Sequence, residues 1–253
     1  MGSDAEVFIF DHVAYSTTVV PAFSGILRGE QPADWLQPFI KKRELKPELW
    51  GKNDLSRYSA ALNPDLSWPG GPYDLEWTSI DRDIPSADTV EQVNWLFKIA
   101  VSIKCLGASQ FVGRSMTVSH YSTILSELGV RKDNRIVALL AALGKRGFVI
   151  GYQFGFGFEG INGWLDPFET AELAEKLDAL PLPRYEISFA AMEHFRTANT
   201  GGYECPGFSF EALSLSFLRT TAAIAARQNR GLLWGNDIMP PEYYLEFSSS
   251  ITS

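Results

Sequence analysis

Apolar residues recur at helical spacing along much of the chain, and they predict several long helices. Residues 89–106 are apolar around much of the helical circumference, so we expect a central helix here, ended by Gly107. Residues 119–128 and 133–146 are expected to form an antiparallel helix pair. The last long helix is predicted over 208–229.

One further helix is marked by its first residues. Asp166 stands at the N-cap position, Pro167 at the first helical position, and Glu169 completes a capping box. The helix is expected to run to about Leu180, before the prolines that follow. Shorter helices, kept short by prolines or by the breaks that follow them, are expected within 32–50 and around 187–196.

Alternating apolar and polar residues indicate a small number of strands. Short strands are expected at 6–10, 73–78 and 231–234, and a glycine–aromatic ribbon at 147–164 provides another. Strands and helices do not alternate strictly along the chain. We therefore expect an α+β fold, with a small mixed β-sheet covered by several helices and one long apolar central helix.

The length of the chain favours one sizeable core. The only candidate boundary is the stretch 51–88, which is rich in Asn, Pro, Gly, Ser and Asp. We interpret residues 1–253 as a single α+β domain, in which 1–88 is a loop-rich N-terminal part and 89–253 is the helical and sheet core.

The ribbon separates aromatic side chains from small ones on the two faces of an extended strand. Aromatic residues occupy alternate positions from Tyr152 to Phe158, and the other face carries Gln153, Gly155, Gly157 and Glu159. Either a helix packs closely on the glycine face, or the small residues leave room for a ligand with Glu159 at its rim. The pattern G-x-G-x-x-G also occurs here, but no helix begins after it, which excludes a dinucleotide site.

The net charge of −8 and the pI near 5.0 argue against nucleic acid and anionic membranes as partners. The first residues lack the basic and apolar regions of a secretory signal, and no apolar run is long enough to cross a membrane. Cys105 and Cys205 lie far apart, and both are expected to be reduced thiols. These features predict a soluble cytoplasmic protein.

Charged and aromatic residues mix in the N-terminal loops, where sites often lie on a scaffold. Glu76 stands between Leu75 and Trp77. Burial at this position would raise the pKa of its carboxyl group and suit it to general acid–base catalysis. Arg57 is a candidate clamp for a substrate carboxylate. The alternative is that these residues only decorate a polar strand and its loops.

A second candidate segment follows the apolar helix at 107–115. Its glycines and small residues, with Ser109 among them, would let backbone amides approach an anion, and Arg114 could clamp a carboxylate. The alternative is a loop or edge strand with a solvated Arg114. No Walker pattern is present, so a phosphate site has little support.

Metal and organic cofactors are not expected. The three histidines (His12, His120 and His194) have no ligand spacing among themselves or with the cysteines. The chain also lacks a G-x-S-x-G nucleophile elbow.

Two resemblances follow from these residues. From Gly163-Trp-Leu-Asp-Pro-Phe-Glu to Leu232-Leu-Trp234 the chain resembles small uncharacterised bacterial α+β proteins in its packing pattern, which implies no activity. In size and aromatic content it also resembles the Pictet–Spengler cyclases of bacterial β-carboline biosynthesis, which join an aromatic amine to an aldehyde. This resemblance implies Arg57 as anchor, Glu76 as acid–base residue and Ser109 as polar contact. No histidine falls between Arg57 and Ser109.

We therefore expect a cofactor-independent enzyme of the cyclase or lyase type, acting by acid–base chemistry on an aromatic or carboxylate-bearing small molecule. Glu76 or Glu159 would be the proton shuttle and Arg57 or Arg114 the carboxylate clamp. Aromatic walls would come from Trp77, Tyr152 and Trp164. The rival interpretation is a non-enzymatic binding protein, such as an immunity-type inhibitor with an acidic surface. The seven tryptophans favour a homodimer interface in either case.

Overall fold

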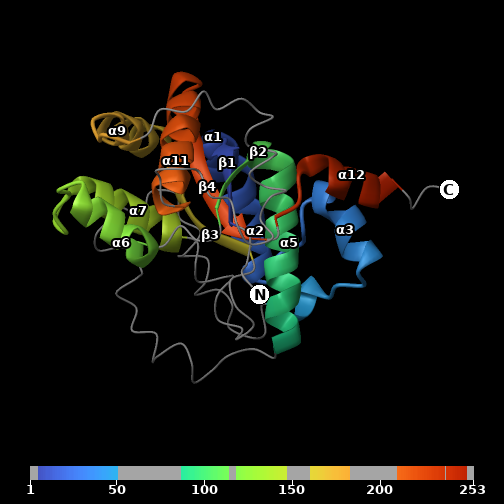
Figure 1. Cartoon of the computed structure of the whole chain (residues 1–253). Coiled ribbons are helices and arrows are strands. Elements are labelled where there is room, and N and C mark those ends of the chain that lie inside the picture. Colours follow the sequence, from blue (N-terminus) through green and yellow to red (C-terminus); the bar gives the residue numbers. More distant parts are fainter. Residues whose placement is uncertain are drawn as a thin grey trace. The chain divides into compact units, whose positions relative to one another are not determined.

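The computed structural model combines helices with a β-sheet, and this confirms the α+β class (Figure 1). The chain forms two compact units, each built from separate segments. Unit 1 comprises Met1–Phe10, Gly107–Lys145 and Asn162–Asp237, and unit 2 comprises Asp11–Leu106, Arg146–Ile161 and Ile238–Ser253. The interpretation as a single domain stays a prediction. The structure describes residues 5–50, 87–113, 118–146, 160–182, 210–236 and 238–249.

Unit 1 holds the sheet and four helices of the described chain, with the first residues of two strands belonging to unit 2. Its strands are β1 (Ala5–Phe10), β2 (Leu106–Gly113), β3 (Gly160–Leu165) and β4 (Gly231–Asn236). Its helices are α6 (Val118–Glu127), α7 (Arg135–Lys145), α9 (Pro167–Asp178) and α11 (Phe210–Arg227). The helices predicted at 119–128, 133–146 and 208–229 are confirmed.

The four strands follow the order β2-β1-β4-β3, so β1 and β4 are central and β2 is an edge strand. β1 and β4 are antiparallel, and their register runs from Glu6 opposite Gly235 to Phe10 opposite Gly231. Val7 and Phe8 point to opposite faces of the sheet, and both are fully buried. Both faces of this central pair are therefore covered, and the strands predicted at 6–10 and 231–234 are confirmed.

Helix α9 begins as its sequence predicts. The Asp166 carboxylate accepts a 2.8 Å hydrogen bond from the Glu169 amide, and the Glu169 carboxylate accepts one of 3.1 Å from the Asp166 amide. This reciprocal pair satisfies two amides that a helix start leaves without intrahelical partners. The buried face of α9, which includes Leu173 and Leu177, packs along α11.

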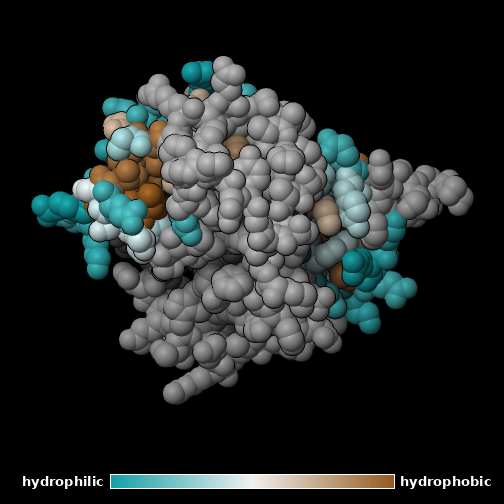
Figure 2. Space-filling view, in the orientation of Figure 1, coloured by the Kyte–Doolittle hydropathy of each residue, from teal (hydrophilic) through white to brown (hydrophobic). Residues whose placement is uncertain are grey.

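Glycine permits a close backbone approach where β3 meets α7. A Cβ atom at Gly163 would collide with the carbonyl oxygens of Ala142 and Leu143, near the end of α7. Any larger residue would push the strand and the helix apart. Where α9 lies against α7 and α11, hydrophobic residues are visible among hydrophilic helix surfaces in Figure 2.

Unit 2 is helical in its described part. It contains α1 (His12–Ala14), a π-helical segment η1 (Tyr15–Val19), α2 (Val20–Leu27), η2 (Asp34–Leu36), α3 (Gln37–Lys42), η3 (Pro47–Leu49), α5 (Ala87–Cys105) and α12 (Pro241–Ser249). The short helices expected within 32–50 and the long helix expected at 89–106 are confirmed. Helices over 12–27 and 241–249 were not predicted from the sequence.

The π-helical turn lies immediately before Pro21, which sits inside the continuous helix 12–27. Proline has no N–H to donate to the carbonyl four residues earlier, and its ring crowds that carbonyl. The helical turn widens at this point, because the Val20 amide donates to the Tyr15 carbonyl, five residues back. The wider turn lets the helix continue through a residue that usually ends one.

Helix α5 packs on α1, η1 and α12. Phe97 meets Phe23 of α2 edge-on, with ring centroids 5.0 Å apart. Two cations also tie α5 to the η2–α3 segment: the Arg43 guanidinium lies 4.7 Å from the Trp95 ring, and Lys104 lies 4.8 Å from the ring of Trp35. No helix among the described residues is long and apolar enough to cross a membrane.

Candidate functional site

Most of the residues predicted to form a site lie outside the described residues. These are Arg57, Glu76, Trp77, Arg114, Tyr152 and Glu159. Ser109 belongs to the edge strand β2, which agrees with one of the two interpretations of that segment. Trp164 lies in β3 and is buried, with 1% of its surface exposed. The roles proposed for these residues stay predictions.

Helix α11 carries polar side chains into the interior of unit 1, which sequence reasoning missed. Ser214, Ser216, Arg219 and Thr221 are all buried. The Arg219 guanidinium donates to the Ser216 hydroxyl at 3.2 Å and to the Leu182 carbonyl at 3.4 Å. The Thr221 hydroxyl donates to the Phe217 carbonyl at 3.0 Å, one turn back. These residues alternate with apolar ones on a helix that buries most of its surface, so no pattern distinguished them.

Among the described residues of unit 1, the phenol of Tyr121 on α6 stands out for its burial. Tyr121 is fully buried, and α6 packs on α11. Burial raises the pKa of the Tyr121 hydroxyl above its ordinary value, and the negative charge of Glu211 raises it further. The nearby Ser214 hydroxyl acts in the opposite direction. The Tyr121 phenol therefore holds its proton more strongly than an exposed tyrosine does.

Cys105 does not provide a nucleophile. Its thiol is buried, and burial raises the thiol pKa well above its ordinary value, against a smaller lowering by Lys104. The Cys105 carbonyl accepts a 2.7 Å hydrogen bond from the Asp11 amide, where the strand β1 passes into the first helix. Cys105 is a packing residue in the reduced state. In the described part of the chain no group of His, Cys, Asp and Glu side chains is arranged to hold a metal ion.

Unit 2 presents a different kind of candidate, which is a partly apolar surface at the start of α12. Among the described residues, five large hydrophobic side chains are exposed, and three of them fall at Met239, Tyr243 and Leu245. Met239 lies two residues before α12, and Tyr243 lies in the first turn of that helix. Single exposed apolar residues are ordinary, whereas several in one short stretch favour a contact surface.

The structure fixes the backbone under this surface from two sides. The Met239 carbonyl accepts a 2.8 Å hydrogen bond from the buried Ser102 hydroxyl of α5. The Met239 amide donates to the hydroxyl of Tyr244, which is itself buried and packs edge-on against Tyr243. The Met239 and Tyr243 side chains are thus exposed on a backbone held in place by buried groups.

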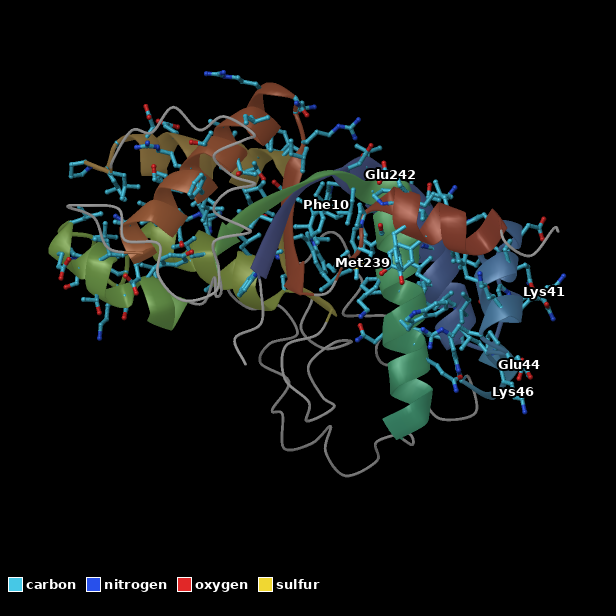
Figure 3. All side chains as sticks on the ribbon, turned by 45° about the vertical axis from the view of Figure 1, so that its right-hand side comes forward. Phe10, Lys41, Glu44, Lys46, Met239 and Glu242 are labelled. Carbon is cyan, nitrogen blue, oxygen red and sulfur yellow. The ribbon has the colours of Figure 1, made fainter. Side chains whose placement is uncertain are left out.

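Exposed charged residues also lie on α12 and around the end of α3. Lys41 and Lys46 are exposed at and beyond the end of α3, which packs on α12, and Glu44 lies between them. Glu242 is exposed in the first turn of α12, where the positive end of the helix dipole favours an acidic side chain. Figure 3 shows Lys41 at the end of α3 and Glu44 and Lys46 in the segment that follows it, with Glu242 and Met239 on the other side of the view.

The comparisons with known proteins supply no family for this chain. No protein-family model, no curated protein and no solved structure matches it. The resemblance to Pictet–Spengler cyclases stays a prediction for this reason, and function has to be argued from the residues alone.

Proposed function

We propose that the protein is a small-molecule enzyme that uses acid–base chemistry on an aromatic or carboxylate-bearing substrate, in a biosynthetic condensation or cyclisation. The observation that carries the proposal is the buried Tyr121 phenol, kept protonated beside Glu211 and Ser214. A neutral phenol in an apolar setting can donate a hydrogen bond to a carbonyl or imine on which charge develops.

The remaining roles follow from the residue types. Glu76 or Glu159 is the proposed proton shuttle, because a carboxylate flanked by apolar residues has a raised pKa when buried. Arg57 or Arg114 clamps the substrate carboxylate through paired N–H donors. Trp77, Tyr152 and Trp164 provide aromatic walls, and Ser109 provides a polar contact. The chemistry requires no organic cofactor, and the reduced, buried Cys105 is compatible with work in the cytoplasm.

The test is a product search with matched variants. The purified protein is incubated with aromatic ethylamines and aldehydes, and condensation products are sought by mass spectrometry at the summed mass less one water. We expect Glu76→Gln or Glu159→Gln to lower turnover by about 100-fold or more. Tyr121→Phe should lower it as well, whereas Tyr243→Phe, the same change at an exposed tyrosine, should not. The acid–base assignment is wrong if neither glutamate variant lowers turnover.

A non-enzymatic binding protein is the second candidate, and the exposed Met239 and Tyr243 are the observation that favours it. Exposed Met and Tyr side chains on a backbone held by buried hydrogen bonds are typical of a protein contact surface. This candidate expects Tyr243→Glu to abolish capture of a partner protein while the fold is kept. If the same variant leaves every captured protein in place, the surface does not serve this function.

We also propose the finer architecture predicted from the sequence, namely a mixed sheet and α5 as the central helix. The support for α5 is its packing on α1, η1 and α12 and its row of buried residues, which includes Val93, Leu96, Phe97, Ala100 and Val101.

A further inference from the structure

We propose that Asn94 of α5 contacts the substrate, and that its side-chain oxygen accepts a hydrogen bond from the amino group of an aromatic amine. The inference rests on the proposed acid–base function and narrows its substrate class. Asn94 is half-buried, and its Oδ1 atom is enclosed. Among the described residues no group donates a hydrogen bond to this oxygen. A buried acceptor without a donor costs free energy, which a ligand that supplies the donor recovers.

The Asn94 amide lies directly against Gly160, the first residue of β3, and both residues belong to unit 2. A Cβ atom at Gly160 would stand 2.7 Å from Oδ1 and 3.2 Å from Nδ2 of Asn94, which is too close for a side chain. Gly160 also has a φ of 101°, a backbone conformation that glycine adopts without strain. Glycine at position 160 therefore brings the backbone close to the polar end of Asn94.

This contact connects Asn94 with the segment that the sequence marks as a candidate for ligand binding. Gly160 is the last glycine of the G-x-G-x-x-G pattern in the glycine–aromatic ribbon, and Glu159, a proposed proton shuttle, immediately precedes it in the sequence. Close packing of a helix on glycine usually places an apolar or small side chain there. At Gly160, α5 instead provides a polar amide whose acceptor has no donor among the described residues.

The chemistry of the Asn94 oxygen selects the amine. An amide oxygen only accepts hydrogen bonds, so an ionised carboxylate offers it nothing, whereas an ammonium group offers three N–H donors. A hydrogen bond from a charged donor is also shorter and stronger than one from a neutral donor. The net charge of −8 acts in the same direction, because it attracts cations to the protein. An aromatic amine therefore fits Asn94 better than an aromatic acid does.

The experiment measures the binding of tryptamine to the full-length protein by titration calorimetry, with 3-methylindole as the comparison that lacks the amine. We expect the wild type to prefer tryptamine. Asn94→Leu removes the acceptor at similar volume, and Asn94→Ala removes it without crowding Gly160; each should raise the Kd for tryptamine about tenfold or more. Asn94→Asp keeps an acceptor and should bind at least as tightly as the wild type. Gln92→Leu is the matched control, since Gln92 is a half-buried amide on another side of α5.

Thermal unfolding separates binding from a structural role. The Asn94 oxygen has no donor to lose among the described residues, so Asn94→Leu should unfold at the wild-type temperature or above while its affinity falls. A wild type that binds tryptamine no better than 3-methylindole overturns the proposal, and so do Asn94→Leu and Asn94→Ala proteins with the wild-type Kd.

Product formation is a separate readout, which distinguishes this contact from the acid–base function. Weaker tryptamine binding in the Asn94 variants, together with turnover that neither Glu76→Gln nor Glu159→Gln lowers, would support the amine contact and reject the acid–base function. Turnover that falls in a glutamate variant, together with unchanged tryptamine binding in the Asn94 variants, would reject the amine contact alone.

Discussion

The Ser102 hydroxyl of α5 donates a 2.8 Å hydrogen bond to the carbonyl oxygen of Met239, 137 residues further along the chain. Ser102 is fully buried, so its hydroxyl needs a partner within the protein. The bond joins α5 to the residue that lies just before α12. One buried hydroxyl thus holds the backbone of an exposed residue in place.

Ser102→Ala should remove this bond with little change in volume. We expect a loss of about 1 kcal/mol in the free energy of unfolding, because the Met239 carbonyl is left without its donor. Urea denaturation measures the loss, and amide hydrogen exchange should be faster over 239–245. Ser126→Ala, at an exposed position on α6, is the control and should stay within about 0.5 kcal/mol. Equal stabilities for the two variants would contradict the structural role of the bond.

Tyr121 should make the protein sensitive to alkaline pH. The unfolded chain releases the tyrosine proton near pH 10.0, whereas burial and Glu211 keep the folded phenol protonated above that pH. Folding therefore binds a proton that the unfolded state has lost, and stability falls as the pH rises above about 10. The free energy of unfolding, measured between pH 8 and 11, should fall less steeply in Tyr121→Phe than in the wild type. Parallel curves would mean that Tyr121 ionises alike in both states.

Cys105 should be inert in the folded protein. Its raised thiol pKa leaves little thiolate at neutral pH, and burial blocks access as well. In a Cys205→Ser background, iodoacetamide should not modify the native protein and should modify it fully after unfolding in denaturant. Intact mass spectrometry counts the added groups. Rapid modification of the native protein would show that the Cys105 side chain opens to solvent.

Gly163→Ala should destabilise the folded protein. The added Cβ atom meets the backbone of α7 at Ala142 and Leu143, which cannot move aside as a flexible side chain can. We expect a loss of about 1–3 kcal/mol in the free energy of unfolding. Gly107→Ala provides the comparison, because a Cβ atom there meets only ordinary contacts with Ile9, at 3.6 Å or more, and its stability should change by less than about 0.5 kcal/mol. Thermal unfolding of both variants measures the two changes. Equal stabilities would contradict the close approach of β3 and α7 at Gly163.

The elements that could be predicted from the sequence are those with local signals. The capping residues Asp166 and Glu169 lie within one turn of each other, so the start of α9 was visible without knowledge of the fold. The helix over 12–27 was missed because Pro21 argues against a helix interior, and the π-helical turn that accommodates it is not encoded by any simple pattern. Helix α12 was missed for a related reason, since Pro240 and Pro241 suggest a loop as readily as a helix start.

The candidate sites depend on long-range packing, which the sequence does not reveal. Tyr121 and Glu211 are far apart in the chain and interact only because α6 packs on α11. No pattern in the sequence distinguishes the exposed Met239 and Tyr243 from the buried Tyr244, and only the folded structure separates them. Glu76, Glu159, Arg57 and Arg114 were chosen by residue type and local pattern, and their proposed roles rest on that choice.

The antiparallel pairing of β1 with β4 joins segments about 220 residues apart along the chain. During synthesis, β1 leaves the ribosome long before its partner exists. At typical elongation rates the delay is on the order of ten seconds or more. Throughout that time Val7, Phe8 and Phe10, all buried in the finished sheet, have no β4 to pair with. The nascent chain is therefore expected to need protection from aggregation, and a chaperone that binds short apolar segments is the natural provider.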